Sequence, residues 1–326
     1  MKVRDQWEVF ILQLKIRTRR PCKPATIAAY ESFWRVWIEP HLGNMDLSKL
    51  ENGAMRQFVS TLTQAKLSPA SIVNIIQVVK GIVASAVDSN GNEKYARTWN
   101  NDFMDLPIIV KEDQETPILD AGAVRDAISE ASGQYAPLFA LLAATGLRVN
   151  EALALKMGSH PESSYWSPRQ SKLVIRKGLY RGQEQSPKTV AGVREVDLAP
   201  RINDYLILCL KDRAPGDFLF TNHNGGPLCL QSVYDAKKEL GLPGLHSFRR
   251  FRITHLEKMD VPRGLAMFWT GHAAGDVHEI YIKMGKDIKA RKDWAEKAGI
   301  GFELPTGENY VEEEKQEERQ EEMADV

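Results

Sequence analysis

The chain contains no long hydrophobic run, few cysteines and no nucleotide-binding glycine motif. Its longest apolar stretches, such as residues 136–147, fall well short of the ~20 residues that a membrane-spanning helix needs, and they are typical of buried core helices. The three cysteines, Cys22, Cys209 and Cys229, are odd in number and lack paired spacing, which argues against a disulfide framework or a zinc ribbon. Neither Gly-x-Gly-x-x-Gly nor a phosphate-loop Gly-Lys-Ser/Thr occurs, so no nucleotide cofactor is predicted. Residues 1–5 are not typical of a secretory signal, and we expect a cytoplasmic protein.

The chain also lacks net charge, with 43 basic and 43 acidic residues, but the two signs are unevenly distributed. Residues 311–326 include eight acidic residues and two basic ones, so the rest of the chain is positive by six charges. A mildly basic body is compatible with a nucleic-acid partner without establishing one. The acidic tail is then either a solvated segment that aids solubility or an electrostatic competitor that covers a basic DNA-binding groove.

What the chain does contain is helical periodicity, which fills the first 90 residues. Apolar residues recur every three or four positions in four stretches, and the last of these follows Ser68-Pro69, an N-cap with a first-turn proline. The four stripes are Trp7, Phe10, Ile11 and Leu14; Ile27, Tyr30, Phe33, Trp34, Trp37 and Ile38; Met55, Phe58, Val59 and Leu62; and Ile72, Ile75, Ile76, Val79, Ile82, Val83 and Ala86. They predict a helical bundle over residues 1–90. Periodicity is then lost, and we predict an interdomain linker over residues 91–115.

A second domain, of mixed structure, is predicted over residues 116–302. Asp120 is placed to cap a first helix, residues 135–144 have the pattern of a buried helix, and further helices are expected from residue 201 onward. Between them, residues 172–177 and about 189–198 have the pattern of a two-stranded hairpin. The predicted fold class is therefore mainly α with a small β-sheet. An acidic tail, residues 303–326, follows and is expected to be disordered.

Basic and imidazole side chains stand at the ends of the predicted elements of the second domain. Arg148 follows the end of the buried helix, His246 and Arg249 are three positions apart, and Gly271-His272 ends an apolar helix. Each has an ordinary explanation when taken alone. Arg148 can form an ion pair with Glu151, and His246 can be a helix cap.

Together these side chains suit the chemistry of a phosphodiester. Two guanidinium groups can each hold a phosphate through two hydrogen bonds, two imidazoles can donate to its remaining oxygens, and a tyrosine hydroxyl can attack its phosphorus. Tyr281, nine residues after His272, is the candidate nucleophile, although it also has the pattern of an ordinary surface residue. Lys188, in the turn of the predicted hairpin, can protonate a departing sugar oxygen without a metal ion. Three more basic residues near the same turn could take this role in its place: Lys172, Lys177 and Arg181.

In these motifs the chain resembles the tyrosine recombinases of the phage integrase family, and the resemblance covers most of its length. Residues 144–153 are similar to the family's first-arginine motif, with Glu151 in the place of its supporting acid. Residues 246–249, His-Ser-Phe-Arg, match its His-x-x-Arg box, and Thr270-Gly271-His272 is similar to its Leu-Gly-His box, with threonine in place of the usual leucine. Tyr281 fits the nucleophile position.

The remaining parts of the resemblance are less specific. Lys188, with residues 194–198 behind it, is similar to the family's hairpin lysine segment, and Arg250 stands where a histidine is common. The helical first domain resembles the SAM-like core-binding domain of the family, as in Thr26–Tyr30 and Pro40–Gly43.

The resemblance implies a site-specific DNA recombinase that cleaves and rejoins strands through a covalent 3′-phosphotyrosine. It implies double-stranded DNA as the partner, clamped between the two domains, a homotetramer on DNA, and DNA-bending accessory proteins; no cofactor, metal or membrane is expected. The implied catalytic residues are Arg148, Lys188, His246, Arg249, His272 and Tyr281, with Glu151 in support. Two different functions remain open: an accessory DNA-binding protein of the same fold that performs no recombination, and a DNA-relaxing activity like that of a type IB topoisomerase.

A last amphipathic stripe lies in residues 287–302, after the candidate nucleophile. It consists of Ile288, Trp294, Ala295 and Ala298. The stripe predicts a helix that packs either on its own domain or on a neighbouring protomer.

Overall fold

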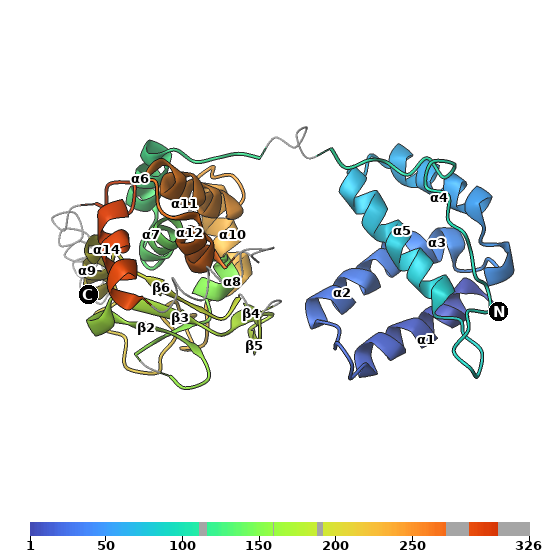
Figure 1. The fold of residues 1–326 in the computed structure, drawn as a ribbon, viewed down its shortest axis with the longest axis horizontal. Coiled ribbons are helices and arrows are strands. Elements are labelled where there is room, and N and C mark those ends of the chain that lie inside the picture. The colour runs from blue at the N-terminus through green and yellow to red at the C-terminus, as the bar shows by residue number, and fades with distance from the viewer. Residues whose placement is uncertain (111–115, 159, 188–191, 272–286, 306–326) are drawn as a thin grey trace, which may run out of the picture. The chain divides into compact units, whose positions relative to one another are not determined.

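The computed structural model describes residues 1–110, 116–158, 160–187, 192–271 and 287–305, and the chain divides into two compact units, residues 1–115 and 116–326 (Figure 1). The described part of the first unit is helical, as its periodicity predicts. Its elements are α1 (Val3–Ile16), α2 (Pro24–Phe33), the π-helical turn η1 (Trp34–Ile38), α3 (Glu39–Leu42), the 3₁₀ turn η2 (Leu47–Lys49), α4 (Asn52–Gln64) and α5 (Pro69–Ala84).

The core of the first unit is made by the apolar stripes of these helices. Leu62 of α4 and Ile75 of α5 are fully buried, and Trp7 of α1 stacks on Trp34 with ring centroids 4.7 Å apart. The predicted start of α5 is confirmed, because the Ser68 hydroxyl accepts a hydrogen bond from a backbone N–H of the first turn. Since each helix buries one face, the bundle forms a core of its own.

Part of the segment expected to be an interdomain linker, residues 91–115, packs on the first unit instead. Arg97 donates to the backbone carbonyls of Leu47 and Ser48 at 3.3 and 3.1 Å. The Asn52 side chain binds the backbone on both sides of Trp99, and Met104 is fully buried. These contacts involve backbone polar groups and one apolar side chain, so the loss of helical periodicity does not reveal them.

The second unit combines helices with a small sheet. Its elements are α6 (Ala121–Glu130), α7 (Tyr135–Thr145), α8 (Val149–Ala152), β1 (Leu155–Met157), β2 (Ser164–Ser167), the 3₁₀ turn η3 (Pro168–Gln170), β3 (Lys172–Ile175), β4 (Gly178–Tyr180), β5 (Gln183–Gln185), β6 (Arg194–Asp197), α9 (Pro200–Cys209), α10 (Leu230–Glu239), α11 (His246–Lys258), α12 (Arg263–Thr270) and α14 (Ile288–Ala298). Asp120 caps α6 as predicted, since its carboxylate accepts from the Ala123 N–H at 2.8 Å.

Helix α7 forms the centre of this unit. Every residue from Ala136 to Thr145 is buried, and α6, α9 and α11 pack around it (Figure 1). A four-stranded sheet of order β1-β2-β3-β6 packs beside the helices, with β1 parallel to β2 and the other pairs antiparallel. The central position of α7 places its C-terminal end, where Arg148 follows, among the other elements of the unit.

The sheet is larger than the predicted hairpin. Strands β3 and β6 pair as expected, but β1 and β2 were not predicted, and β4 and β5 form a second hairpin within the expected turn. The unpredicted strands have three or four residues each. Segments this short rarely show enough alternation of apolar and polar residues to be recognised, and β3 and β6, of four residues each, are recognisable because they flank the predicted turn.

Helix α14 packs on its own unit, which decides between the two arrangements that its stripe predicts. The Arg291 side chain is 3% exposed, donates to the Asp197 carboxylate of β6 at 2.8 Å and pairs with Glu195. Ala295 and Ala298 are buried in the core of the unit. The helix is thus held by a buried ion-pair cluster as well as by apolar contact.

Candidate phosphate-binding site

The site begins at the turn that ends α7. Gly146 has φ of 68° and ψ of 21°, the left-handed conformation that terminates a helix, and its N–H bonds the Leu142 carbonyl. The Thr145 hydroxyl donates to the Leu141 carbonyl at 2.6 Å and accepts from the Leu147 N–H at 3.3 Å. This sharp, hydrogen-bonded turn sends the chain into α8, whose N-cap residue is Arg148.

Glu151 orients Arg148 through both its backbone and its side chain. One carboxylate oxygen accepts from the Arg148 N–H at 3.0 Å, and the other accepts from the Arg148 guanidinium at 2.9 Å. The Arg148 side chain is 47% exposed, whereas that of Glu151 is only 9% exposed. Arg148 can therefore offer further donors to a ligand while Glu151 holds it through two hydrogen bonds.

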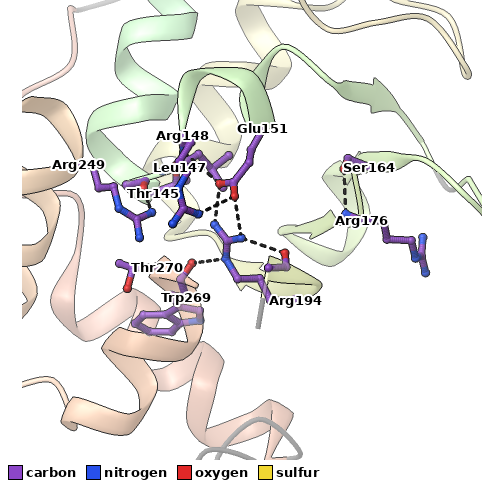
Figure 2. Close-up of polar contacts among 12 residues, drawn as sticks. Thr145, Leu147, Arg148, Glu151, Ser164, Arg176, Arg194, Arg249, Trp269 and Thr270 are labelled. Carbon is purple, nitrogen blue, oxygen red and sulfur yellow. Dashed lines mark hydrogen bonds and ion pairs between the residues drawn. The ribbon is translucent and has the colours of Figure 1, made fainter. Parts of the chain in front are cut away.

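A second arginine, Arg194 on β6, binds the same carboxylate from the protein interior (Figure 2). Its Nη2 donates to Glu151 Oε2 at 2.9 Å, and its Nη1 lies 3.3 Å from Oε1. Burial alone would raise the pKa of Glu151, but the charge and hydrogen bonds of Arg194, with those of Arg148, outweigh burial and hold this pKa below its usual range. Sequence reasoning missed this role, because Arg194 is recognisable in sequence only as part of a strand.

Helix α11 brings the second candidate arginine to the same turn. The residue Arg249 is 1% exposed, and its Nη1 donates to the Gly146 carbonyl at 2.7 Å (Figure 2). His246 is the exposed first residue of α11 and lies one helical turn before Arg249. Burial, followed by the charges of Arg249, Arg250 and Arg148, lowers the pKa of His246 below its ordinary value. Three of the predicted site residues, Arg148, His246 and Arg249, thus lie around one turn.

The end of α12 reaches the same place. Gly271 ends this helix with φ of 66°, and a Cβ atom there would lie 2.8 Å from the Arg194 guanidinium carbon. Arg194 Nε also donates to the Trp269 carbonyl at 2.8 Å. The residue that follows Gly271 is the candidate His272, which lies outside the described residues, as do Lys188 and Tyr281.

Two basic residues to which the sequence assigns no single role, Lys172 and Arg250, have partners within the second unit. Lys172, which could replace Lys188 as the acid, pairs with Glu195 at 2.7 Å. Arg250, which stands where the family often has histidine, donates through Nε and Nη2 to the Pro117 carbonyl at 3.0 and 2.6 Å. Arg250 therefore forms hydrogen bonds within the second unit. Lys177 directly precedes β4, and Arg181 lies in the turn between β4 and β5.

The chemistry of the described site is that of an anion-binding site. Across the described residues, no three His, Cys, Asp or Glu side chains are grouped so that they could hold a metal ion, and no helix is long and apolar enough to cross a membrane. A cavity of about 550 Å³ lies between α11 and α12, but its lining, which includes Glu257, Asp260 and Met267, contains none of the three converging residues. The convergent groups are two guanidiniums and an imidazole, which suit a phosphodiester.

Comparison with known proteins agrees with this fold. Residues 13–63 match the family model of the phage integrase N-terminal SAM-like domain. No curated protein is significantly similar to the chain in sequence.

Solved structures resemble the chain over most of its length. The Tn1549 transposon integrase in complex with a circular intermediate DNA is 16% identical, with a TM-score of 0.66 over 97% of this chain and 99% of that one. A lambda integrase dimer bound to a core site is 15% identical, with a TM-score of 0.59 over 84% and 96%. The XerH site-specific recombinase is 18% identical, with a TM-score of 0.53 over 80% and 77%. The predicted fold class and the resemblance are thereby confirmed: the chain has the fold of the phage integrases and related recombinases.

Proposed function

We propose that this protein is a tyrosine-type site-specific recombinase, which cleaves and rejoins DNA through a covalent 3′-phosphotyrosine intermediate. The observation that carries the proposal is the convergence of Arg148 and Arg249, which are a hundred positions apart in sequence, on the Gly146 turn. Arg249 binds the carbonyl of that turn, and Arg148 follows it by two residues. The fold shared with DNA-bound integrases supports the same function.

In this proposal the two arginines bind the scissile phosphate. Their guanidinium groups match the geometry of phosphate oxygens and stabilise the charge that develops when phosphorus becomes five-coordinate. His246 donates a ring N–H to a phosphate oxygen. Glu151 keeps Arg148 in place.

The chemical step follows from the residues that the resemblance supplies. The Tyr281 hydroxyl loses its proton to water and attacks phosphorus, while the bond from phosphorus to the 5′ oxygen breaks. Lys188 donates a proton to that oxygen, and His272 contributes a further hydrogen bond to the phosphate. The products are a 3′-phosphotyrosine and a free 5′-hydroxyl. Because the ester stores the energy of the broken bond, the 5′-hydroxyl of a partner strand can reverse the attack without a nucleotide cofactor.

The proposed partner is double-stranded DNA, on which the protein assembles as a homotetramer. The support comes from relatives: the Tn1549 integrase was solved with circular intermediate DNA, and a lambda integrase tetramer with a Holliday junction. Most of the affinity should come from contacts with DNA phosphates. The logarithm of the binding constant should therefore fall linearly with the logarithm of the salt concentration, with a slope of about −0.9 for each neutralised phosphate.

The proposal is tested by trapping the covalent intermediate. Duplexes taken from direct repeats that flank the gene are nicked next to the cleavage point, so that the released strand diffuses away and the adduct accumulates. We expect the wild type to form an adduct and Tyr281→Phe to bind the same duplex without forming one. Tyr234→Phe, at an exposed tyrosine of α10, is the matched control and should form the adduct at the wild-type rate.

Three outcomes would contradict the proposal. An adduct formed by Tyr281→Phe would move the nucleophile elsewhere. Binding by the wild type without any adduct would favour the accessory DNA-binding protein. Relaxation of supercoiled DNA by a monomer, without strand exchange between two sites, would favour the topoisomerase-like activity.

A further inference from the structure

Arg194 is buried beneath the site and joins three separate parts of the second unit (Figure 2). Its guanidinium bonds Glu151 of α8 through two nitrogens, the Trp269 carbonyl at the end of α12 through Nε, and the Gly192 carbonyl through Nη1 at 3.1 Å. The Arg194 side chain is 1% exposed, and all three of its guanidinium nitrogens donate to oxygens of the protein, so we assign it no contact with DNA. Whatever it contributes to a reaction has to act through the residues that it holds.

The first of these residues is Glu151, whose carboxylate lies between two arginines. Arg148 approaches it from the exposed side, and Arg194 from the interior. If Arg194 were absent, Arg148 alone would have to compensate a carboxylate that is 9% exposed, and a phosphate would compete with that carboxylate for Arg148. With Arg194 present, the two guanidiniums and one carboxylate leave a net positive charge, and the exposed share of it lies on Arg148.

The second contact is with the chain that leads to His272. The Trp269 carbonyl is in the last turn of α12, where carbonyls lack partners within the helix, and a buried cation suits that position. Gly271 packs so closely on the guanidinium that a single added carbon would collide with it. Arg194 therefore ties the position of Arg148 to the end of α12.

We propose that Arg194 is a positioning residue for DNA strand cleavage. It compensates the Glu151 carboxylate, which leaves the positive charge of Arg148 available to the scissile phosphate, and it holds the end of α12 next to Glu151. This inference rests on the proposed function for its substrate. It differs from a purely structural role in one respect: the loss of the Arg194 charge should weaken the preference of the site for a charged phosphate, in addition to any effect on folding.

The deciding measurement is a binding preference that requires no chemistry. In the Tyr281→Phe background, affinity is compared between a duplex with a normal scissile phosphate and one with a neutral methylphosphonate at the same position. We expect the parent to prefer the phosphate and Arg194→Met to prefer it less, because Glu151 then cancels the charge of Arg148 and only Arg249 still attracts the phosphate. Arg194→Lys retains the charge and should retain most of the preference.

A matched control separates this effect from destabilisation. Asn203→Ala removes another buried polar side chain of the same unit, which bonds Trp166 and the Pro168 carbonyl rather than site residues. It should lower the melting temperature and leave the phosphate preference unchanged. In the Tyr281-containing protein, Arg194→Met should slow single-turnover cleavage by about 10²-fold, the scale expected for displaced catalytic groups, and Arg194→Lys should slow it less.

The outcomes also separate this inference from the proposed function. If Arg194→Met prefers phosphate as strongly as the parent does, while cleavage in the wild type is normal, the positioning role is refuted and the recombinase function stands. A parent that shows no phosphate preference refutes the inference as well. If Arg194→Met does not fold, the Arg194→Lys variant decides: cleavage and preference both equal to the wild type refute the role. A wild type that forms no covalent adduct refutes the proposed function, whatever the binding preference shows.

Discussion

Replacing Gly271 with alanine tests how closely the end of α12 is fitted to the buried guanidinium of Arg194. Gly271 has φ of 66°, and a Cβ atom there would lie 2.8 Å from both Cζ and Nη1 of Arg194. Atoms of folded proteins do not approach a Cβ so closely, and Arg194 has no open space to move into, because its side chain is 1% exposed. The substitution must therefore displace Arg194 or unwind the end of α12.

The expected cost has two parts. Alanine in the left-handed conformation costs about 1–2 kcal/mol. Moving Arg194 breaks at least one hydrogen bond to the charged Glu151, which costs about 1.5–3 kcal/mol. We therefore expect Gly271→Ala to lower the free energy of unfolding of the second unit by about 2.5–5 kcal/mol.

The control is Gly241→Ala, at a glycine with φ of 61° and no atom within 4 Å of an added Cβ. It carries the backbone strain without the collision, so it should cost only about 1–2 kcal/mol. Hydrogen exchange with mass spectrometry, on peptides that cover β6 and α12, reports the free energy of opening of this unit separately from the first. If Gly271→Ala costs no more than Gly241→Ala, the fit between Gly271 and Arg194 contributes nothing, and the reasoning is refuted.

Three further predictions follow from the described contacts and the proposed chemistry. In thermal unfolding, Arg291→Met should destabilise the second unit by about 3–5 kcal/mol, because it leaves the buried Asp197 carboxylate without its cation. The control Lys289→Met, on the exposed side of the same helix, should change the stability by less than about 0.5 kcal/mol. The pKa of Glu151 is lower in the folded than in the unfolded chain, so its carboxylate stabilises the fold above its ordinary pKa of 4.5, and this contribution is lost as the pH falls through the folded value. The stability difference between the wild type and Glu151→Gln should therefore shrink as the pH falls below about 4.5, and a constant difference would contradict the assigned pKa direction. Lys188→Ala should slow cleavage about 10²–10⁴-fold, the usual loss for a general acid, and a 5′-bridging sulfur, which leaves without protonation, should restore the rate; rescue of Lys177→Ala instead would assign the acid to Lys177.

Local features of the fold could be predicted from the sequence because their signals lie within a few residues. Apolar spacing predicts α1, α4 and α5, and the caps at Ser68 and Asp120 occur as expected. The buried helix α7 and its glycine end are recognisable from a run of small and apolar residues followed by Thr145-Gly146. In each case a helical period or a single capping hydrogen bond is enough to specify the element.

The short strands and the packing of residues 91–106 could not be predicted in this way. Strand β2 depends on pairing with β3, and β1 depends on pairing with β2. The contacts of Arg97 are with backbone carbonyls 50 and 49 positions away. Such pairings depend on which surfaces remain available after the helices pack. They leave no periodic pattern in the segments themselves.

The candidate site divides in the same manner. The sequence was enough to propose Arg148, His246 and Arg249 as site residues, because guanidinium and imidazole groups bind the oxygens of a phosphodiester. Only the tertiary structure decided that Arg249 binds the Gly146 turn across 103 positions, and that Arg194 connects Glu151 to Trp269 across 43 and 75 positions. A side chain's type is a property of its own position, whereas the partner of a buried charge is settled by the packing of distant elements, since that charge must be compensated wherever the fold places it.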